Sequence, residues 1–174
     1  VCVLVLRKKS YKLPPLKAIL YGGQQERGIR PGTIPVALVA GCGKACEIAE
    51  FEYQRNMKYS QELKNELLMV LDESGIQYHF NGEQNYCVPS TLNICIDGVS
   101  SEALMISTKQ FCGVSNGSAC TSKSYSPSYV LVAMGIATEQ IESSIRFSWG
   151  PDTDKEEVLR NFKALLEIAK QIKS

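Results

Sequence analysis

The longest regular pattern in the chain has the 3.6-residue spacing of a helix and extends from about Pro35 to Ser74. Thr33 is a candidate N-cap for this helix, and Gly75 stands where a helix-terminating glycine is expected. The first half of the pattern is small and apolar on nearly all sides, whereas the second half places leucines among charged residues. We therefore expect one long helix that connects a larger body to a smaller one.

Shorter patterns lie on both sides of this helix. The apolar run Val1–Leu6 predicts a strand buried on both faces, whose partner strands must come from elsewhere, and the glycine-rich segment 22–33 predicts a loop. After the helix, strands are expected at 76–80, 92–96, 113–115 and 144–148. Helices are expected at 100–109, at 127–135 and after a capping box formed by Thr153 and Glu156. This mixture predicts an α/β protein.

Composition limits the possible functions. The chain has 174 residues, of which 44% are hydrophobic and 21% charged, so one packed core is expected. A formal net charge of +1 provides no global field for nucleic acid or an anionic membrane, and we expect direct contact with neither. No apolar run reaches the roughly 20 residues of a membrane span, and the chain starts without the features of a signal peptide. We expect a cytoplasmic protein.

The cysteines separate into two kinds. There are seven, with no Cys-x-x-Cys pair, which argues against a disulfide framework and a zinc site and leaves no metal assigned. Structural positions are expected for six: Cys2, Cys42, Cys46, Cys87, Cys95 and Cys112. Cys120 differs because it lies in the polar segment 115–124, where nothing bulky buries it and Lys123 favours its thiolate. Cys120 is therefore the candidate nucleophile, and the single histidine, His79, is expected to be a surface or half-buried packing residue.

Several motifs now suggest a family. Residues 22–33 (GGQQERGIRPGT), 117–122 (GSACTS) with 127–131 (PSYVL), and 144–148 (SIRFS) follow one another in this order. Together they resemble the C-terminal part of cysteine desulfurases, which are pyridoxal-phosphate enzymes of the aminotransferase class V family. The long segment around Cys120 is similar to group I enzymes of the NifS and IscS type. Asn116 and Trp149 resemble the DndA branch, which serves DNA phosphorothioation.

The resemblance implies a mechanism. L-cysteine would be the substrate, and Cys120 would take its sulfur as a persulfide and release alanine, before the sulfur passes to an acceptor protein. Arg146 would bind the substrate carboxylate, with a structural ion pair to the C-terminal helix as the alternative. Thr33 would donate to the phosphate of pyridoxal 5′-phosphate in the partner subunit of a homodimer, or would only cap the long helix. The acceptor would be a scaffold for iron–sulfur cluster assembly or a DNA-modification protein.

The resemblance also implies an arrangement of domains. The chain would contain the end of the large domain (1–33), the long interdomain helix (34–74) and a small α+β domain of fold-type I (75–174), with a mixed or antiparallel sheet covered by helices on one face. The family's cofactor lysine follows a histidine, and no lysine here does. We therefore expect this C-terminal portion to be inactive alone. A selenocysteine lyase and a cofactor-free sulfur-carrier or docking module remain as alternatives.

Overall fold

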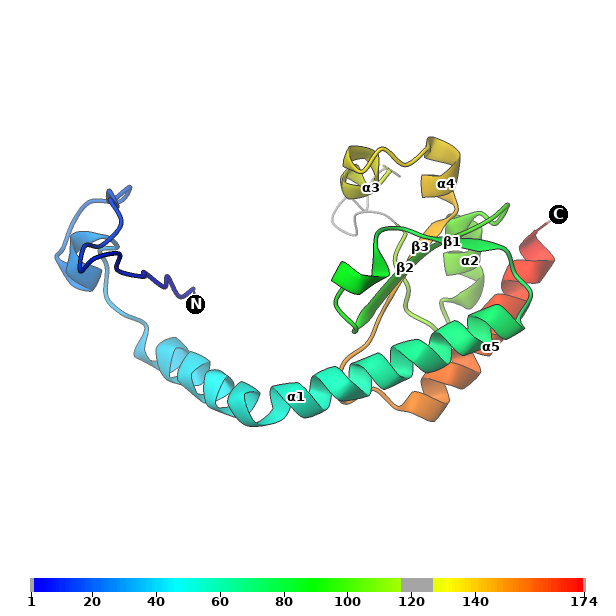
Figure 1. The fold of residues 1–174 in the computed structure, drawn as a ribbon, viewed down its shortest axis with the longest axis horizontal. Helices are drawn as coiled ribbons and strands as arrows, with labels where there is room; N and C mark the ends of the chain where they lie inside the picture. The colour runs from blue at the N-terminus through cyan, green and yellow to red at the C-terminus, as the bar shows by residue number, and fades with distance from the viewer. Residues whose placement is uncertain (1, 117–126, 174) are drawn as a thin grey trace. The chain divides into compact units, whose positions relative to one another are not determined.

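The computed structural model describes residues 2–116 and 127–173 (Figure 1). The chain divides into two units, residues 1–53 and 54–174. Helix α1 (Val36–Glu73) contains the boundary between them. The long helix predicted from the sequence is thus confirmed, and it ends where Gly75 takes a φ of +73° that other residues adopt only with strain.

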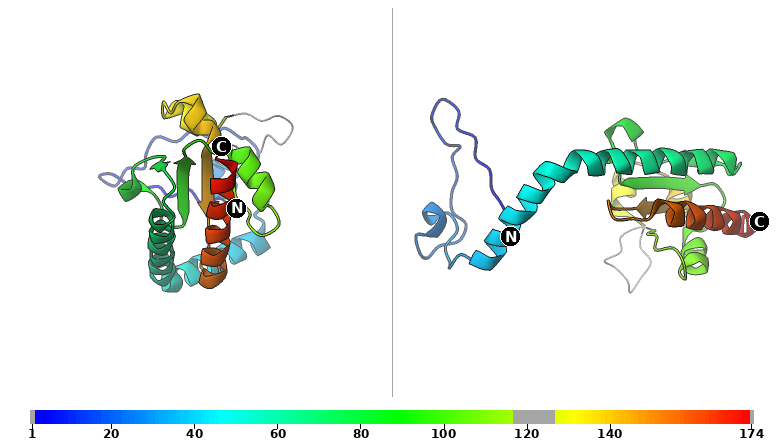
Figure 2. Two further views of the ribbon diagram at one scale, coloured as in Figure 1. Left: turned by 90° about the vertical axis from the view of Figure 1, so that its right-hand side faces the viewer. Right: turned by 90° about the horizontal axis from the view of Figure 1, so that it is seen from below.

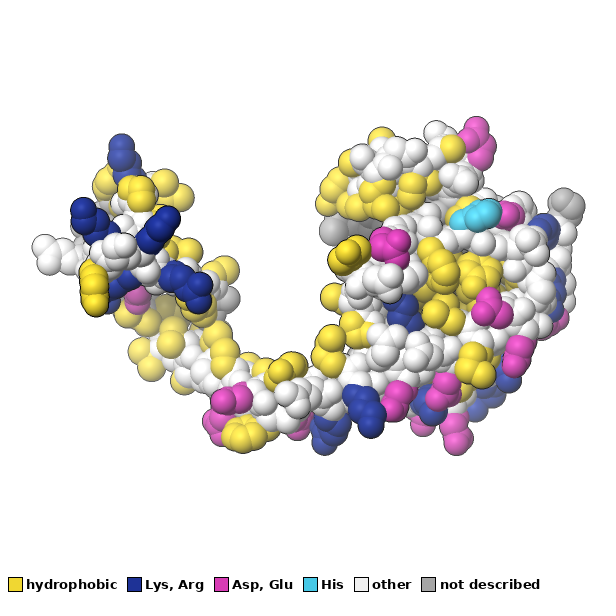
Figure 3. All heavy atoms as spheres, viewed as in Figure 1, with side chains coloured by type: hydrophobic (Ala, Val, Ile, Leu, Met, Phe, Trp, Pro, Cys, Tyr) yellow, Lys and Arg dark blue, Asp and Glu magenta, His cyan; other side chains and the backbone are white. Residues whose placement is uncertain are grey.

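The first unit holds no buried residue among those that are described. Its 3₁₀ turn η1 (Gln25–Gly28) lies within the predicted loop, which is confirmed. The strand predicted at Val1–Leu6 is wrong for this chain, because residues 2–6 have no strand partner and Val5 is 85% exposed. Other apolar side chains of this unit are also exposed, as the yellow spheres in Figure 3 show. An apolar run makes a strand only where another strand accepts its hydrogen bonds.

The second unit is built on a three-stranded antiparallel sheet in the order β1–β2–β3 (Figure 2). The strands are β1 (Tyr78–Phe80), β2 (Thr91–Ile96) and β3 (Ser144–Ser148), with the 3₁₀ turn η2 (Gln84–Tyr86) between β1 and β2. These three strands confirm the sequence prediction. The strand expected at 113–115 is reduced to a single bridge between Ser115 and Arg146.

Helices complete the second unit. They are α2 (Ser101–Thr108), α3 (Tyr129–Ala133), α4 (Thr138–Glu142) and α5 (Lys155–Ile172). The Ser100 hydroxyl caps α2 by accepting from the backbone N–H of Ala103 at 3.3 Å. The predicted cap of the last helix is wrong by one residue, because Asp154 caps α5 by accepting from the N–H of Glu157 at 2.8 Å. Thr153 instead accepts from the N–H of Gly150.

The hydrophobic core lies against one face of the sheet. Side chains alternate between faces along a strand, so β3 turns Ile145 and Phe147 toward the core and its other residues away. The apolar face of α5 meets them there, with Phe147 and Phe162 in an edge-to-face contact at 5.1 Å between ring centroids. The C-terminal half of α1 packs into the same cluster, and Lys155 on α5 forms an ion pair with Glu66 on α1 at 2.6 Å. One face of the sheet is thereby left for polar side chains.

Candidate functional site

Arg146 lies on the polar face of the sheet. It is exposed, while its neighbours Ile145 and Phe147 are buried on the opposite face. Its guanidinium forms no ion pair with any residue that the structure describes, including the acidic residues of α5. The alternative expectation of an ion pair with the C-terminal helix therefore has no support in the described residues. The guanidinium is available to bind an anion.

The backbone of Arg146 holds the chain that leads to Cys120. The N–H of Arg146 donates to the carbonyl of Ser115 at 2.7 Å, and the N–H of Ser115 donates to the carbonyl of Arg146 at 3.1 Å. Cys120 follows Ser115 by five positions in the sequence and lies outside the described residues, as does Lys123. The described chain resumes before α3, whose N-cap position is Ser128. The segment with the candidate nucleophile thus begins at a point fixed to the candidate substrate residue.

A network of amides and hydroxyls lies beside Arg146. Asn93 on β2 is the register partner of Arg146, and its Oδ1 accepts a hydrogen bond from Nδ2 of Asn81 at 2.9 Å. The same Nδ2 donates to the Ser144 hydroxyl at 2.8 Å, and that hydroxyl donates to the carbonyl of Gln140 at 2.6 Å. This network was not predicted from the sequence. Its only signal was the polar alternation of Thr91 and Asn93 with the apolar residues of the second strand.

The described cysteines differ in burial and acidity. Cys95 is buried, and burial together with the nearby Asp97 carboxylate raises the pKa of its thiol to about 11. Burial also raises the pKa of the half-buried Cys112. A high pKa keeps a thiol protonated and weakly nucleophilic. The structural positions expected for these two are confirmed.

Three of the other four described thiols differ from the prediction. Cys2, Cys46 and Cys87 are exposed, so the structural positions predicted for them are wrong for this chain, whereas Cys42 is half-buried, as Cys112 is. His79, the single histidine (cyan in Figure 3), is exposed as expected, with its Nε2 at 3.1 Å from Oδ2 of Asp97. Over residues 2–116 and 127–173, no three His, Cys, Asp or Glu side chains gather as a metal site requires.

Thr33 belongs to the first unit and is described there alone. It is exposed, and its hydroxyl has no hydrogen bond to a described residue. Because α1 begins only at Val36, the expected capping by Thr33 is wrong. Gly32, at φ +109°, donates its N–H to Oε1 of Gln25 at 3.2 Å and presents no Cβ. A hydroxyl without a described partner can donate one hydrogen bond to a phosphate oxygen, so Thr33 is compatible with the phosphate contact expected from the resemblance.

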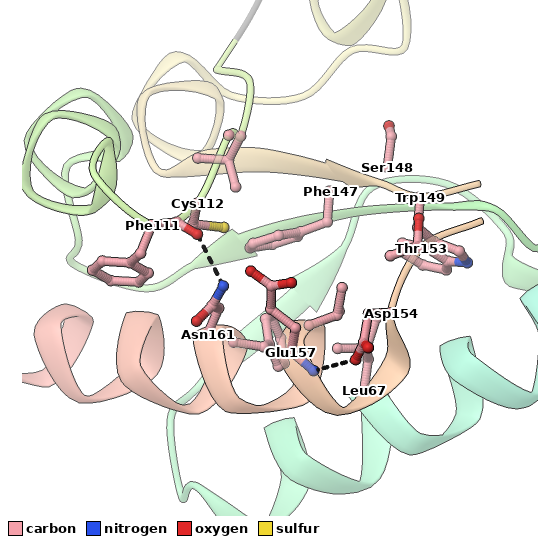
Figure 4. Close-up of a pocket in the computed structure, with 14 residues that line it drawn as sticks. Leu67, Phe111, Cys112, Phe147, Ser148, Trp149, Thr153, Asp154, Glu157 and Asn161 are labelled. Atoms are coloured by element: carbon pink, nitrogen blue, oxygen red, sulfur yellow. Dashed lines mark hydrogen bonds between the residues drawn. The ribbon is translucent and has the colours of Figure 1, made fainter. Parts of the chain in front are cut away.

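The second unit contains a cavity of about 340 Å³, shown in Figure 4. Phe147, Phe162, Trp149 and Leu67 line it, and Glu157 contributes a carboxylate. Because Phe147 and Arg146 are consecutive on β3, this cavity lies on the face of the sheet opposite the guanidinium. The cavity and the candidate substrate residue are therefore separate features.

In the described part of the chain, no helix combines the length and hydrophobicity needed to cross a bilayer.

Comparisons with known proteins agree with the motifs. Residues 6–160 match the model of the aminotransferase class-V family. The cysteine desulfurase IscS of Rickettsia africae is 39% identical over 154 residues, which are 88% of this chain and 37% of that protein. A NifS-like protein of known structure superimposes with a TM-score of 0.73 at 27% identity, covering 90% of this chain and 40% of its own. DndA from Streptomyces lividans does so with a TM-score of 0.61 at 35% identity, covering 80% and 38%.

These matches confirm the resemblance read from the motifs and the fold expected from it. They also show a difference in length, since the chain spans only 37% of the Rickettsia relative. The family model covers far more than half of the chain. The chain belongs to the aminotransferase class-V family.

Proposed function

We propose that this chain acts in a pyridoxal-phosphate-dependent cysteine desulfurase, which converts L-cysteine to L-alanine and carries the sulfur as a persulfide. One observation supports this most directly. The paired backbone hydrogen bonds between Ser115 and Arg146 join the start of the Cys120 segment to a residue whose guanidinium has no ion pair with any described residue. A substrate held by Arg146 would thus lie beside the origin of the segment that carries the nucleophile. The similarity to the IscS, NifS-like and DndA proteins points to the same activity.

Arg146 is the proposed site for the substrate carboxylate. A guanidinium offers parallel N–H donors that match the two carboxylate oxygens. On β3 the backbone of Arg146 is hydrogen-bonded to Ser115, and its neighbours Ile145 and Phe147 pair with β2. This support fixes the Cα position from which the Arg146 side chain reaches the substrate.

Cys120 is the proposed nucleophile. Its thiolate would attack the sulfur of L-cysteine, and the electron pair of the thiolate would form the new sulfur–sulfur bond. The bond between the substrate sulfur and its β-carbon would break, and that carbon would keep the electron pair and take a proton. The products are L-alanine and a Cys120 persulfide. Among the described thiols, Cys95 and Cys112 are poor candidates because of their raised pKa values.

Thr33 is the proposed donor to the phosphate of the cofactor bound in the partner subunit of a homodimer. When bound, pyridoxal 5′-phosphate supplies an electron sink for bond cleavage in the amino acid substrate. Thr33 would contribute only to holding it, through its free hydroxyl. No lysine of this sequence follows a histidine, so no residue of this chain is proposed to bind the cofactor covalently.

The sulfur acceptor is proposed as a class of protein. It would be a scaffold for iron–sulfur cluster assembly or a DNA-modification protein, and the similarity to DndA keeps the second possibility open. The reaction is proposed to occur in the cytoplasm. Two other functions stay in competition: a selenocysteine lyase, and a carrier or docking module that needs no cofactor.

The experiment uses the whole protein purified from its source. It is incubated with pyridoxal phosphate and either L-cysteine or L-selenocysteine, and alanine is quantified together with protein-bound sulfur. A desulfurase forms alanine from L-cysteine in amounts that match the sulfur transferred. Alanine formed from the selenium substrate alone indicates the lyase. Uptake of sulfur from a persulfide donor without alanine indicates the carrier module.

A further inference from the structure

Asn93 on β2 is the register partner of Arg146 on β3. We propose that the side-chain amide of Asn93 donates a second hydrogen bond to the substrate carboxylate that Arg146 binds. This inference rests on the proposed function, because it takes the ligand to be an α-amino acid.

Strand geometry makes the two side chains close neighbours. Asn93 and Arg146 are register partners in the antiparallel pair of β2 and β3. The backbone of Arg146 bonds to Ser115, on the far side of β3, and the carbonyl of Asn93 accepts from the N–H of Asn81, on the far side of β2. The two backbones therefore turn away from each other, which makes this a non-hydrogen-bonded pair. Such pairs have the shorter Cα separation, ~4.5 Å, and the closer side chains.

Both side chains also lie on the same face. The β2 residues on either side of Asn93 are Leu92 and Ile94, and both belong to the core. Alternation then places Asn93 on the opposite face, where Arg146 lies. The Asn93 amide and the guanidinium thus border one patch of the polar face.

The amide of Asn93 is held in one orientation. Its Oδ1 accepts from Nδ2 of Asn81, which is itself anchored by its second hydrogen bond, to the Ser144 hydroxyl. The Nδ2 of Asn93 has no acceptor among the described residues. Asn93 is half-buried rather than buried, so part of its surface is open to a ligand. The network therefore places beside Arg146 a donor that, like the guanidinium, has no partner in residues 2–116 and 127–173.

These groups match a carboxylate. Arg146 supplies charge and paired donors, and Asn93 supplies one further N–H that a carboxylate oxygen can accept. A purely structural role for Asn93 would need only its Oδ1, which receives the bond from Asn81. The two roles use different atoms of one side chain and can be separated by substitution.

Asn93→Asp is the decisive variant, because it keeps an oxygen for Asn81 but replaces the donor by an acceptor. In the whole enzyme, we expect Asn93→Asp to raise the KM for L-cysteine at least tenfold, about the effect of losing a hydrogen bond to a charged group. The inhibition constant of cysteamine, which is the same molecule without the carboxylate, should change less than twofold. Thr91→Ser is the matched control, because Thr91 is on the same strand and face but pairs with Ser148.

A second variant guards against a folding defect. Asn93→Ala should raise the KM for L-cysteine without affecting cysteamine, and its effect should shrink in an Arg146→Ala background because the two residues share one ligand. Equal shifts for both ligands, or an unchanged KM in Asn93→Asp, would overturn the inference. If the wild-type enzyme forms no alanine from L-cysteine, the proposed function fails and this inference fails with it. If the wild-type enzyme turns over L-cysteine and the Asn93→Asp variant has the same KM, the inference about Asn93 is rejected but the proposed function is not.

Discussion

Ser115 and Arg146 donate to each other's carbonyls, so the segment that continues to Cys120 starts at a fixed place on β3. Ser115→Pro removes one of the two donors and leaves the rest of the bridge in place. Since a backbone hydrogen bond contributes about 1 kcal/mol, we expect turnover of L-cysteine to fall roughly 5- to 10-fold. Ser115→Ala retains the backbone donor and should match the wild type in the same alanine assay. A similar loss in both variants would mean that the side chain, not the bridge, matters.

Cys120→Ser should abolish sulfur transfer. A serine oxygen cannot carry a persulfide, so protein-bound sulfur and alanine should both disappear while substrate still binds. Cys87→Ser is the control, because Cys87 is an exposed thiol with no proposed role. The measurement is mass spectrometry of the protein after incubation with L-cysteine. Persistence of a persulfide in the Cys120→Ser variant would identify another thiol as the nucleophile.

Arg146→Ala should weaken substrate use by roughly 10- to 150-fold, the range expected for a lost charge-assisted hydrogen bond. Arg146→Lys should recover only part of this loss, because a lysine offers no bidentate pair of donors. The stability should change by less than about 0.5 kcal/mol, since the guanidinium is exposed and has no ion pair with described residues. Steady-state kinetics and urea unfolding test the two statements separately. A normal KM with reduced stability would indicate a structural role.

Leu67→Ala should destabilise the second unit by about 2–5 kcal/mol, because it opens a cavity in the core. Leu67 is 1% exposed on α1 and packs in the cluster formed with β3 and α5. Met69→Ala, two residues further along the helix at 60% exposure, should change stability by no more than about 0.5 kcal/mol. Denaturant unfolding followed by circular dichroism compares them. An equal loss of stability in both variants would mean that Leu67 does not belong to the hydrophobic core.

The stability should decrease in alkaline solution. Burial raises the pKa of Cys95 to about 11, above the value of ~8.5 for a free thiol. Between these values the unfolded chain releases the proton that the native protein keeps, so the stabilisation is complete below about pH 8.5 and is lost as the pH rises toward 11. In the Cys95→Ala variant, the denaturant midpoint of unfolding should depend less on pH over this window than in the wild type. An identical pH profile in both proteins would contradict the shift.

The second unit shows how far local sequence patterns determine structure. The leucine spacing of α1, the alternation in β2 and β3 and the helix stop at Gly75 depend on nearby residues and were predicted from them. Helix α4 was not predicted, because it has only five residues and little periodicity. The cap of α5 was misplaced because Thr153 and Asp154 are adjacent polar residues that both suit an N-cap. The run Val1–Leu6 failed for another reason, since pairing depends on residues far away in the sequence.

The candidate site was only partly accessible from sequence. Arg146 and Cys120 stand in motifs that resemble a known family, so the order of residues is enough to single them out. Asn93 could not be found in this way, because its importance arises from its register with Arg146 and from the bond to Asn81. Register depends on the pairing of two strands that are about fifty positions apart, and no local pattern reports it.

The opposite orientation of Arg146 and Phe147 protects the site against misfolding. A slip of β3 by one residue would exchange every inward side chain for an outward one, bringing the guanidinium into the core and Phe147 into solvent. Desolvating an unpaired cation costs several kcal/mol, and the contact with Phe162 would be lost as well. Any copy of the protein whose core is correctly packed must therefore also present Arg146 outward. Correct hydrophobic packing on one side of the strand therefore ensures that the ligand-binding side chain is correctly oriented on the other side.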